Sequence, residues 1–162
     1  MITEYLNLSF RSIGYVLANR VNMGVQTGAL SFKQTNEPLG DITSMIGIID
    51  DHMHLSLAIS FNEATALSIS GDYSQQVHYH IDDSVIDVVK IITTMIGNDL
   101  KHRLQNLGFT PILQHPTVIH GFDRKIFHPF EEAVIVLPTN TELGIVFSEV
   151  SVQMFSDYRQ AS

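Results

Sequence analysis

Residues 82–108, DDSVIDVVKIITTMIGNDLKHRLQNLG, decide the fold, because they predict one long amphipathic helix with both ends marked. The side chains of Asp82, Asp83 and Ser84 can accept hydrogen bonds from the free N–H groups of a first helical turn, and the aspartates place negative charge at the positive end of the helix dipole. Gly108 can adopt, at little steric cost, the left-handed conformation that commonly ends a helix. We therefore expect the rest of the chain to pack against this helix.

Apolar residues recur at spacings of three and four along this segment, which predicts a stripe that faces the core. The stripe consists of Val85, Val89, Ile92, Ile96, Leu100, Leu104 and Leu107, widened by Val88 and Met95. The opposite side carries Asp87, Lys90, Thr94, Asn98 and Lys101. At ~100° per residue, positions 87, 91, 94 and 98 fall within one narrow sector, so Ile91 is an apolar residue among polar neighbours.

The length and composition indicate one globular domain. The 162 residues are 44% hydrophobic and 16% charged, with no low-complexity run or linker that would divide them. A chain of this size buries roughly 70% of the surface that its unfolded form exposes. We expect a single domain over residues 1–162.

The charge and the residue types exclude several classes of function. The 17 acidic and 9 basic residues give a net charge of −8, and no basic cluster could neutralise a series of phosphates, so nucleic acid is not an expected partner. No apolar run approaches the ~18 residues of a membrane span, so we expect a cytoplasmic protein without a membrane partner. The absence of cysteine excludes disulfides, thiolate metal sites and thiol nucleophiles.

Hydrophobic periodicity predicts the other elements. Helices are expected at about 2–20 and at 63–69, the second capped by Asn62 and closed by Gly71. The expected strands are one or two short strands within 21–33, an antiparallel hairpin of 42–49 with 53–61, an edge or irregular strand within 109–121, and strands at 131–137 and 143–155 joined by a loop at 138–141. Grouped strands and helices favour an α+β domain, with helices packed on one face of a mainly antiparallel sheet.

The order of these segments resembles a known family. The strand DITSMIGI at 41–48, a short helix, the long helix with MIG at 95–97 and then PTVIHG at 116–121 are similar to the CheX branch of the CheC/CheX/FliY chemotaxis phosphatase family. The similarity extends from about Tyr5 to Val152. It implies a fold of the CheX/CheC type, a bacterial chemotaxis or signal-transduction protein, a homodimer, and a CheY-like receiver domain of a response regulator as the partner.

The resemblance also implies where the site lies. Family members remove phosphate from the aspartyl-phosphate of a receiver domain, and their motif on the long helix is Asp or Ser, three residues, Glu, two residues and Asn. In the family the Asn amide orients the attacking water and the Glu engages a receiver lysine. Counted back from Gly108 and Pro116 without gaps, this sequence has Asp87, Ile91 and Thr94 at the three positions.

A shifted register would place Asp83, Asp87 and Lys90 on the motif instead. It keeps a carboxylate but changes the distance to Gly108, so we prefer the ungapped register. Neither register retains the Glu/Asn pair.

These substitutions predict a module that binds a receiver domain and hydrolyses its phosphate weakly or not at all. Isoleucine accepts no hydrogen bond from a lysine, and a threonine hydroxyl presents its donor and acceptor differently from an amide. The expected contact residues are Asp87, Lys90, Ile91, Thr94 and Asn98. The alternative is an active phosphatase with Asp87 or Thr94 as catalytic residues. Ile91 is also compatible with an isolated surface residue, or with one covered by a loop of the same domain.

The eight histidines raise the question of a metal site. Pairs at i, i+2 share one face of a strand and could ligate a metal together. The candidates are His52 with His54, His78 with His80, and the later His115, His120 and His128. Alternate histidines more often form the polar side of a strand, so we expect no metal and no cofactor, and a small-ligand or metal-binding module is the third class of function.

Overall fold

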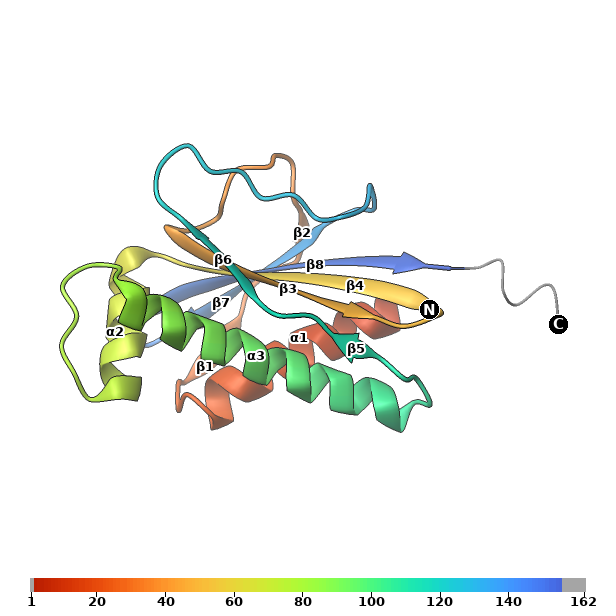
Figure 1. The fold of residues 1–162 in the computed structure, drawn as a ribbon, viewed down its shortest axis with the longest axis horizontal. Helices are drawn as coiled ribbons and strands as arrows, with labels where there is room; N and C mark the ends of the chain where they lie inside the picture. Colours follow the sequence, from red (N-terminus) through yellow and green to blue (C-terminus); the bar gives the residue numbers. More distant parts are fainter. Residues whose placement is uncertain (1, 156–162) are drawn as a thin grey trace, which may run out of the picture.

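The computed structural model describes residues 2–155, and it arranges them in three layers (Figure 1). One antiparallel sheet of eight strands forms the middle layer of this described part. Its strands are β1 (Val25–Thr27), β2 (Ser31–Phe32), β3 (Ile42–Ile49), β4 (Met53–Phe61), β5 (Ile112–Leu113), β6 (Thr117–His120), β7 (Ile135–Thr141) and β8 (Gly144–Met154). The helices are α1 (Ile2–Asn19), α2 (Glu63–Ser74) and α3 (Asp83–Asn106).

The strand order is β1-β7-β8-β4-β3-β5, with β2 also on β7 and β6 also on β3. Helices α1 and α3 pack on one face of the sheet, and α2 stands at one end (Figure 1). The predicted α+β fold, with helices on one face of an antiparallel sheet, is therefore confirmed.

The predicted long helix and both of its end signals are confirmed. The Asp82 carboxylate accepts a hydrogen bond from the Val85 N–H at 3.0 Å. At the other end Gly108 has a φ of 96°, and its N–H donates to the Gln105 carbonyl at 3.0 Å. Both contacts are local, which is why the sequence alone marks these ends.

The hydrophobic core lies between the helices and one face of the sheet. The buried residues of α3 are Val85, Val88, Val89, Ile92, Thr93, Ile96, Gly97, Leu100 and Leu104. Leu107, which the pattern placed on the core stripe, is exposed, because the helix ends before it and Leu107 serves as the C-cap. The stripe is otherwise as predicted.

The predicted hairpin of β3 with β4 is confirmed, and it forms the centre of the sheet. Asp50 closes its turn: one carboxylate oxygen accepts from the His52 N–H at 2.9 Å, and the other accepts from the Thr110 N–H at 2.8 Å. The second bond ties the hairpin turn to the segment that follows α3.

The helix expected at 63–69 is longer than predicted. It continues through Gly71 to Ser74 and ends at Gln75, which adopts the left-handed conformation with a φ of 59°. Asn62 occupies the N-cap position, but its side chain makes no capping bond. Asp41 accepts from the Glu63 N–H at 2.7 Å instead, so a residue 22 positions away does the capping.

The strand expected at 131–137 begins and ends later than predicted. β7 runs through Pro138 and Asn140, and the turn to β8 falls at residues 142–143. Proline lacks an N–H and is tolerated where the neighbouring strand offers no partner. Pro138 meets this condition, because it lies opposite the break between β1 and β2.

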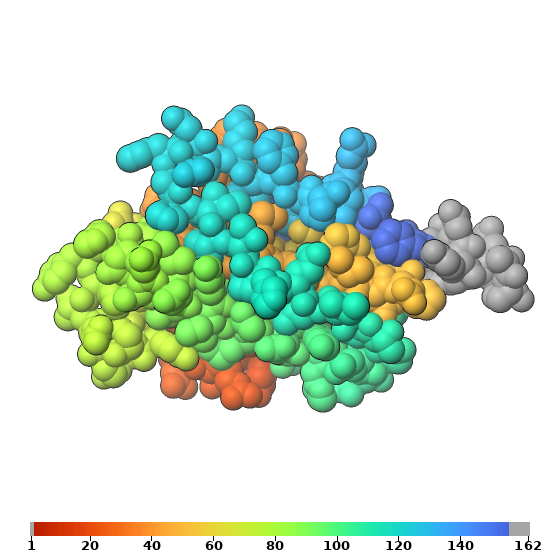
Figure 2. Space-filling model, in the orientation of Figure 1, coloured from red at the N-terminus to blue at the C-terminus, as the bar shows by residue number. Residues whose placement is uncertain are grey.

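Two loop segments form the third layer, over the sheet face that the helices leave free (Figures 1 and 2). We call residues 33–40 and 121–134 together the cover. None of the helices in the described part of the chain is long and apolar enough to cross a membrane.

Candidate functional site

The structure places the predicted contact residues on the solvent side of α3. Asp87, Lys90 and Asn98 are exposed, and Thr94 is half-buried. Ile91 is 40% exposed, so no loop of the described chain covers it. Figure 2 shows the surface of α3, in green, open to solvent. We call these five residues, Asp87, Lys90, Ile91, Thr94 and Asn98, the exposed stripe of α3. Ile91 is the apolar side chain within it.

Close packing of α3 on the sheet holds this stripe in a fixed position. At Gly97 a β-carbon would lie 2.9 Å from Cδ1 of Ile46 on β3 and 2.7 Å from Cδ1 of Leu113 on β5. The helix backbone thus rests on the side chains of the sheet. Strand β6 contacts α3 along its flank and ends at the exposed His120 (Figure 1).

The first turn of α3 is acidic. The backbone hydrogen bond from Val85, together with the nearby charges of His78 and His80, lowers the pKa of the Asp82 carboxyl below its ordinary value. Nδ1 of His78 lies 3.8 Å from the Asp82 carboxylate. Asp83 follows in the same turn and is exposed. Both motif registers, the preferred one and the one that begins at Asp83, therefore lie on accessible surface.

The chemistry open to this stripe is limited. The Asp87 carboxylate can accept hydrogen bonds, and the Thr94 hydroxyl can donate one and accept two. Asn98 offers an amide one turn beyond Thr94, and it borders a groove of about 380 Å³ between α1 and α3. Ile91 offers only apolar contact. The exposed stripe can therefore make polar and apolar contacts with the surface of another protein. Its one hydroxyl, that of Thr94, could hydrogen-bond a water molecule.

The candidate metal ligands do not converge. Among residues 2–155 no group of three or more His, Asp or Glu side chains is arranged to hold a metal ion. His78 contacts Ser74 Oγ at 3.0 Å, while His54 lies against the ring of Phe130 on the far face of the sheet.

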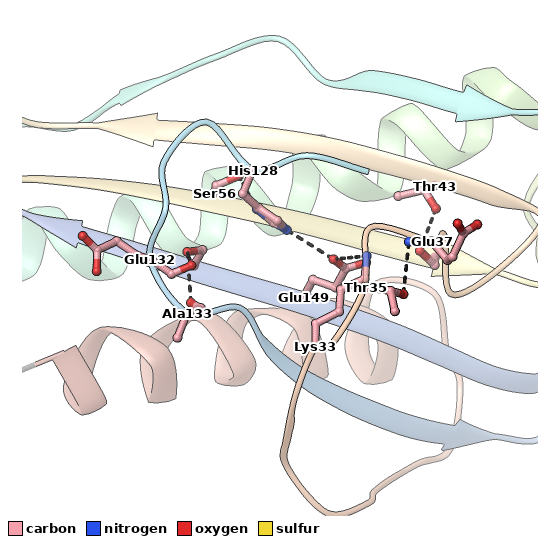
Figure 3. A network of polar contacts seen from close by, with 11 residues as sticks. Lys33, Thr35, Glu37, Thr43, Ser56, His128, Glu132, Ala133 and Glu149 are labelled. Atoms are coloured by element: carbon pink, nitrogen blue, oxygen red, sulfur yellow. Dashed lines mark hydrogen bonds and ion pairs between the residues drawn. The ribbon is translucent and has the colours of Figure 1, made fainter. Parts of the chain in front are cut away.

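That far face also carries a buried ionic cluster that was not predicted from the sequence. Glu149 of β8 is fully buried, and its Oε1 accepts from Lys33 Nζ at 2.8 Å (Figure 3). His128 contacts the same oxygen at 3.3 Å and Ser56 Oγ at 2.7 Å. The only available signal was a lone charge in the middle of β8, among apolar and small residues.

Solved structures share this fold over nearly the whole chain. A CheC-like superfamily protein from Shewanella sp. PV-4 has 26% identity and a TM-score of 0.84, covering 94% of this chain and 99% of its own. The chemotaxis protein CheX from Vibrio vulnificus has 26% identity and a TM-score of 0.82, covering 93% and 99%. CheX in a CheX–CheY–BeF3–Mg2+ complex from Borrelia burgdorferi has 16% identity and a TM-score of 0.76, covering 92% and 97%, which shows the fold alone.

The fold is therefore that of the CheC-like and CheX chemotaxis proteins. Residues 42–140 match the family model described as chemotaxis phosphatase CheX. A comparison with curated proteins finds no match. The chain belongs to the CheX family of chemotaxis phosphatases.

Proposed function

We propose that this protein binds a CheY-like receiver domain through the exposed stripe of α3. The observation that carries the proposal is Ile91, 40% exposed between Asp87 and Thr94 on a closely packed helix. Interfaces favour an apolar anchor surrounded by polar groups. The Borrelia burgdorferi protein of the same fold, solved as a CheX–CheY complex, supports a receiver of this type as the partner.

We propose further that the bound receiver loses its phosphate slowly or not at all through this site. Hydrolysis of an aspartyl-phosphate mainly requires a water held in line with the phosphorus. Removing one preorganised polar group from a reacting centre typically costs on the order of 10²–10³ in rate. Thr94 holds a water less well than the family Asn, and Ile91 engages no lysine.

An active phosphatase is the second candidate function. It is favoured by the presence of a carboxylate at Asp87 and a hydroxyl at Thr94, seven positions apart on one face of α3. Two helical turns separate them, so both can reach one bound receiver. In this mechanism Thr94 or Asp87 would orient the water.

One experiment separates the two functions. The protein is mixed with each phosphorylated receiver domain encoded in its own genome, and phosphate release and complex formation are followed in the same samples. Complex formation with release at the receiver's own rate supports binding alone. Release well above that rate would establish a phosphatase, and the absence of a complex with every receiver would reject both.

We also propose a homodimer that acts in the cytoplasm. Apolar side chains stay exposed at the edge of the sheet formed by β1 and β2, at Leu30 and Phe32, and on the cover at Phe122 and Phe127. Apolar groups of this kind favour association with another protein surface. Sedimentation equilibrium at several protein concentrations measures the mass in solution and tests the homodimer. The mass of a monomer at every concentration would contradict it.

A further inference from the structure

The sheet face beneath the cover is unlike the face beneath the helices. The core cluster takes its strand residues from the helix side, including Leu55, Leu57 and Ile59 of β4. The alternate residues of the same strand, Ser56, Ala58 and Ser60, face the cover side and are small. The cover contributes one buried apolar side chain, Ile126, whereas the helices contribute many, so opening the cover exposes less apolar area to water than separating the helices from the sheet would.

The cover is attached by a small number of polar contacts. Its two segments are joined by two backbone bonds, the first from the Ile126 N–H to the Asn36 carbonyl at 2.7 Å, and by the exposed ion pair of Lys125 with Glu37 at 3.7 Å. The Lys33 N–H donates to the Val134 carbonyl at 2.9 Å, where the cover rejoins the sheet. A cavity of about 390 Å³ separates the two segments, so they do not pack against each other closely.

One side chain of the sheet holds both segments. Glu149 Oε1 accepts from Lys33 of the first segment and contacts His128 of the second. Figure 3 shows Lys33 and His128 reaching Glu149 of β8 from two different loops. All three side chains are at least 94% buried. A buried ion pair is held in place by both partners, and removing one leaves a buried charge without compensation.

The Glu149 side chain, which we call the pin because it holds both segments of the cover, also destabilises the closed form. Glu149 Oε2 is buried and has no hydrogen-bond partner among the described residues. A buried acceptor without a donor loses its hydrogen bonds to water and gains none from the protein, which destabilises the closed form. Opening the cover would let water reach this oxygen, which favours the open form. The closed cover is thus attached by polar contacts and opposed by the burial of one carboxylate oxygen.

We propose that the cover opens as a unit while the helix side of the domain stays folded, and that Glu149 is the pin that holds it closed. The opened form presents Glu149, Ser56 and Ser60 on a hydrated sheet face. This face lies on the opposite side of the sheet from α3, so opening would occur without unseating the proposed receiver-binding stripe. The proposal is independent of the partner that α3 binds.

Hydrogen exchange of the wild-type protein gives the first test. Segments attached by few buried apolar contacts open at lower free energy than the core does. The amides of Lys33 and Ile126 should therefore exchange at least about tenfold faster than hydrogen-bonded amides of β3 and β4. Equal protection of the cover and of these strands would show that the cover opens only on global unfolding, and would overturn the proposal.

The second test changes the pin. Glu149→Gln leaves Lys33 as an uncompensated buried charge, and should accelerate exchange in the cover by on the order of a hundredfold. Protection in α3 and β4 should stay within about threefold of wild type, since separate structural units open independently. The exposed Glu131→Gln within the cover is the matched control and should leave both regions unchanged.

A double variant shows whether Glu149 holds the cover closed through its ion pair with Lys33 or only contributes to the stability of the whole domain. Lys33→Met combined with Glu149→Gln removes both charges, and replacing a buried ion pair as a whole is often neutral or stabilising. Protection of the cover should return to within about tenfold of wild type. Acceleration of core and cover alike in Glu149→Gln, or no recovery in the double variant, would overturn the role of Glu149. If Glu149→Gln does not fold, the wild-type pattern and the double variant decide.

Discussion

A β-carbon placed on Gly97 of α3 would lie 2.9 Å from Cδ1 of Ile46 on β3. Carbon atoms without a bond between them pack at about 3.5–4.0 Å, so a β-carbon at this position would force the end of the Ile46 side chain to move. Leu113 of β5 closes the same contact at 2.7 Å. Gly97 thus allows the helix that carries Ile91 and Thr94 to approach the sheet closely without displacing these side chains of the sheet.

Gly97→Ala should therefore destabilise the protein although alanine is the better helix former. A second glycine offers the matched control: at Gly14 of α1, a β-carbon would meet nothing within 4 Å. Gly14→Ala should raise the free energy of unfolding by about 0.5–1 kcal/mol, the usual gain of alanine over glycine in a helix. Relative to it, Gly97→Ala should lose about 1–3 kcal/mol from overpacking. Urea denaturation of both variants measures the difference, and equal stabilisation would show that Ile46 and Leu113 move aside freely.

Asp50 joins the β3–β4 turn to the segment after α3, so its removal should cost more than its position in a turn suggests. Asp50→Ala leaves the N–H groups of His52 and Thr110 without their acceptor. We expect a loss of about 1–3 kcal/mol in the free energy of unfolding. The exposed neighbour Asp51→Ala should cost less than about 0.5 kcal/mol. A comparable loss in both variants would mean that the turn, rather than the tie to Thr110, is what matters.

Local signals explain why much of the fold could be predicted. The cap at Asp82, the left-handed Gly108 and the apolar stripe of α3 depend on contacts within about one or two helical turns. The β3–β4 hairpin is likewise close in sequence, with two apolar runs and a polar turn between them. Elements of this kind can be read from the residues that form them.

The parts that could not be predicted depend on distant residues. Helix α2 is capped by Asp41 rather than by its own Asn62, and β7 tolerates Pro138 because of a break between two other strands. Glu149 meets Lys33 and His128 across 116 and 21 positions. No periodicity within one strand reports such partners. At the candidate site, the pattern placed Ile91 among polar neighbours but left open whether a loop covers it, and both its exposure and the half-burial of Thr94 required the structure.

Burial against Phe130 makes His54 a sensitive reporter of the sheet face under the cover. The two rings lie 5.0 Å apart, and desolvation lowers the pKa of His54 below its ordinary value. NMR titration of the folded protein should show this pKa below that of a histidine in a short peptide. A His54 signal that titrates at or above the peptide value would contradict the burial.

The direction of the linked stability change follows from that pKa. The unfolded chain takes up a proton at His54 at the ordinary value of 6.5, whereas the folded protein takes it up only at lower pH. The unfolded state therefore binds more protons between the two values. As the pH falls through 6.5 toward the folded value, the contribution of His54 to the stability is lost. His54→Gln should reduce the decline in unfolding free energy between pH 7 and pH 5, measured in urea.

If Ile91 anchors a receiver domain, truncating it should weaken the complex measurably. Ile91→Ala should lower the affinity by about tenfold, as expected for an apolar anchor at an interface centre. Ile145 of β8 is the matched control, because it is the same residue type with 38% exposure and lies on another element. Ile145→Ala should leave the affinity within about twofold of wild type. Isothermal titration with the cognate receiver measures both, and equal effects would place the interface elsewhere.

Restoring the Glu and Asn of the family motif should give α3 the chemistry that its present residues lack. Ile91→Glu combined with Thr94→Asn places the Glu and Asn of the family motif on a helix that packs closely on the sheet at Gly97. Both residues then project from one face at the spacing that the motif requires. We expect phosphate release from the cognate receiver to rise by on the order of 10²–10³, the usual effect of one preorganised polar group at a reacting centre. Thr94→Asn alone should recover part of the gain, because the amide can orient water without the lysine contact. A double variant that binds the receiver normally and still releases no phosphate would show that Ile91 and Thr94 do not occupy the catalytic positions, and would favour the register that begins at Asp83.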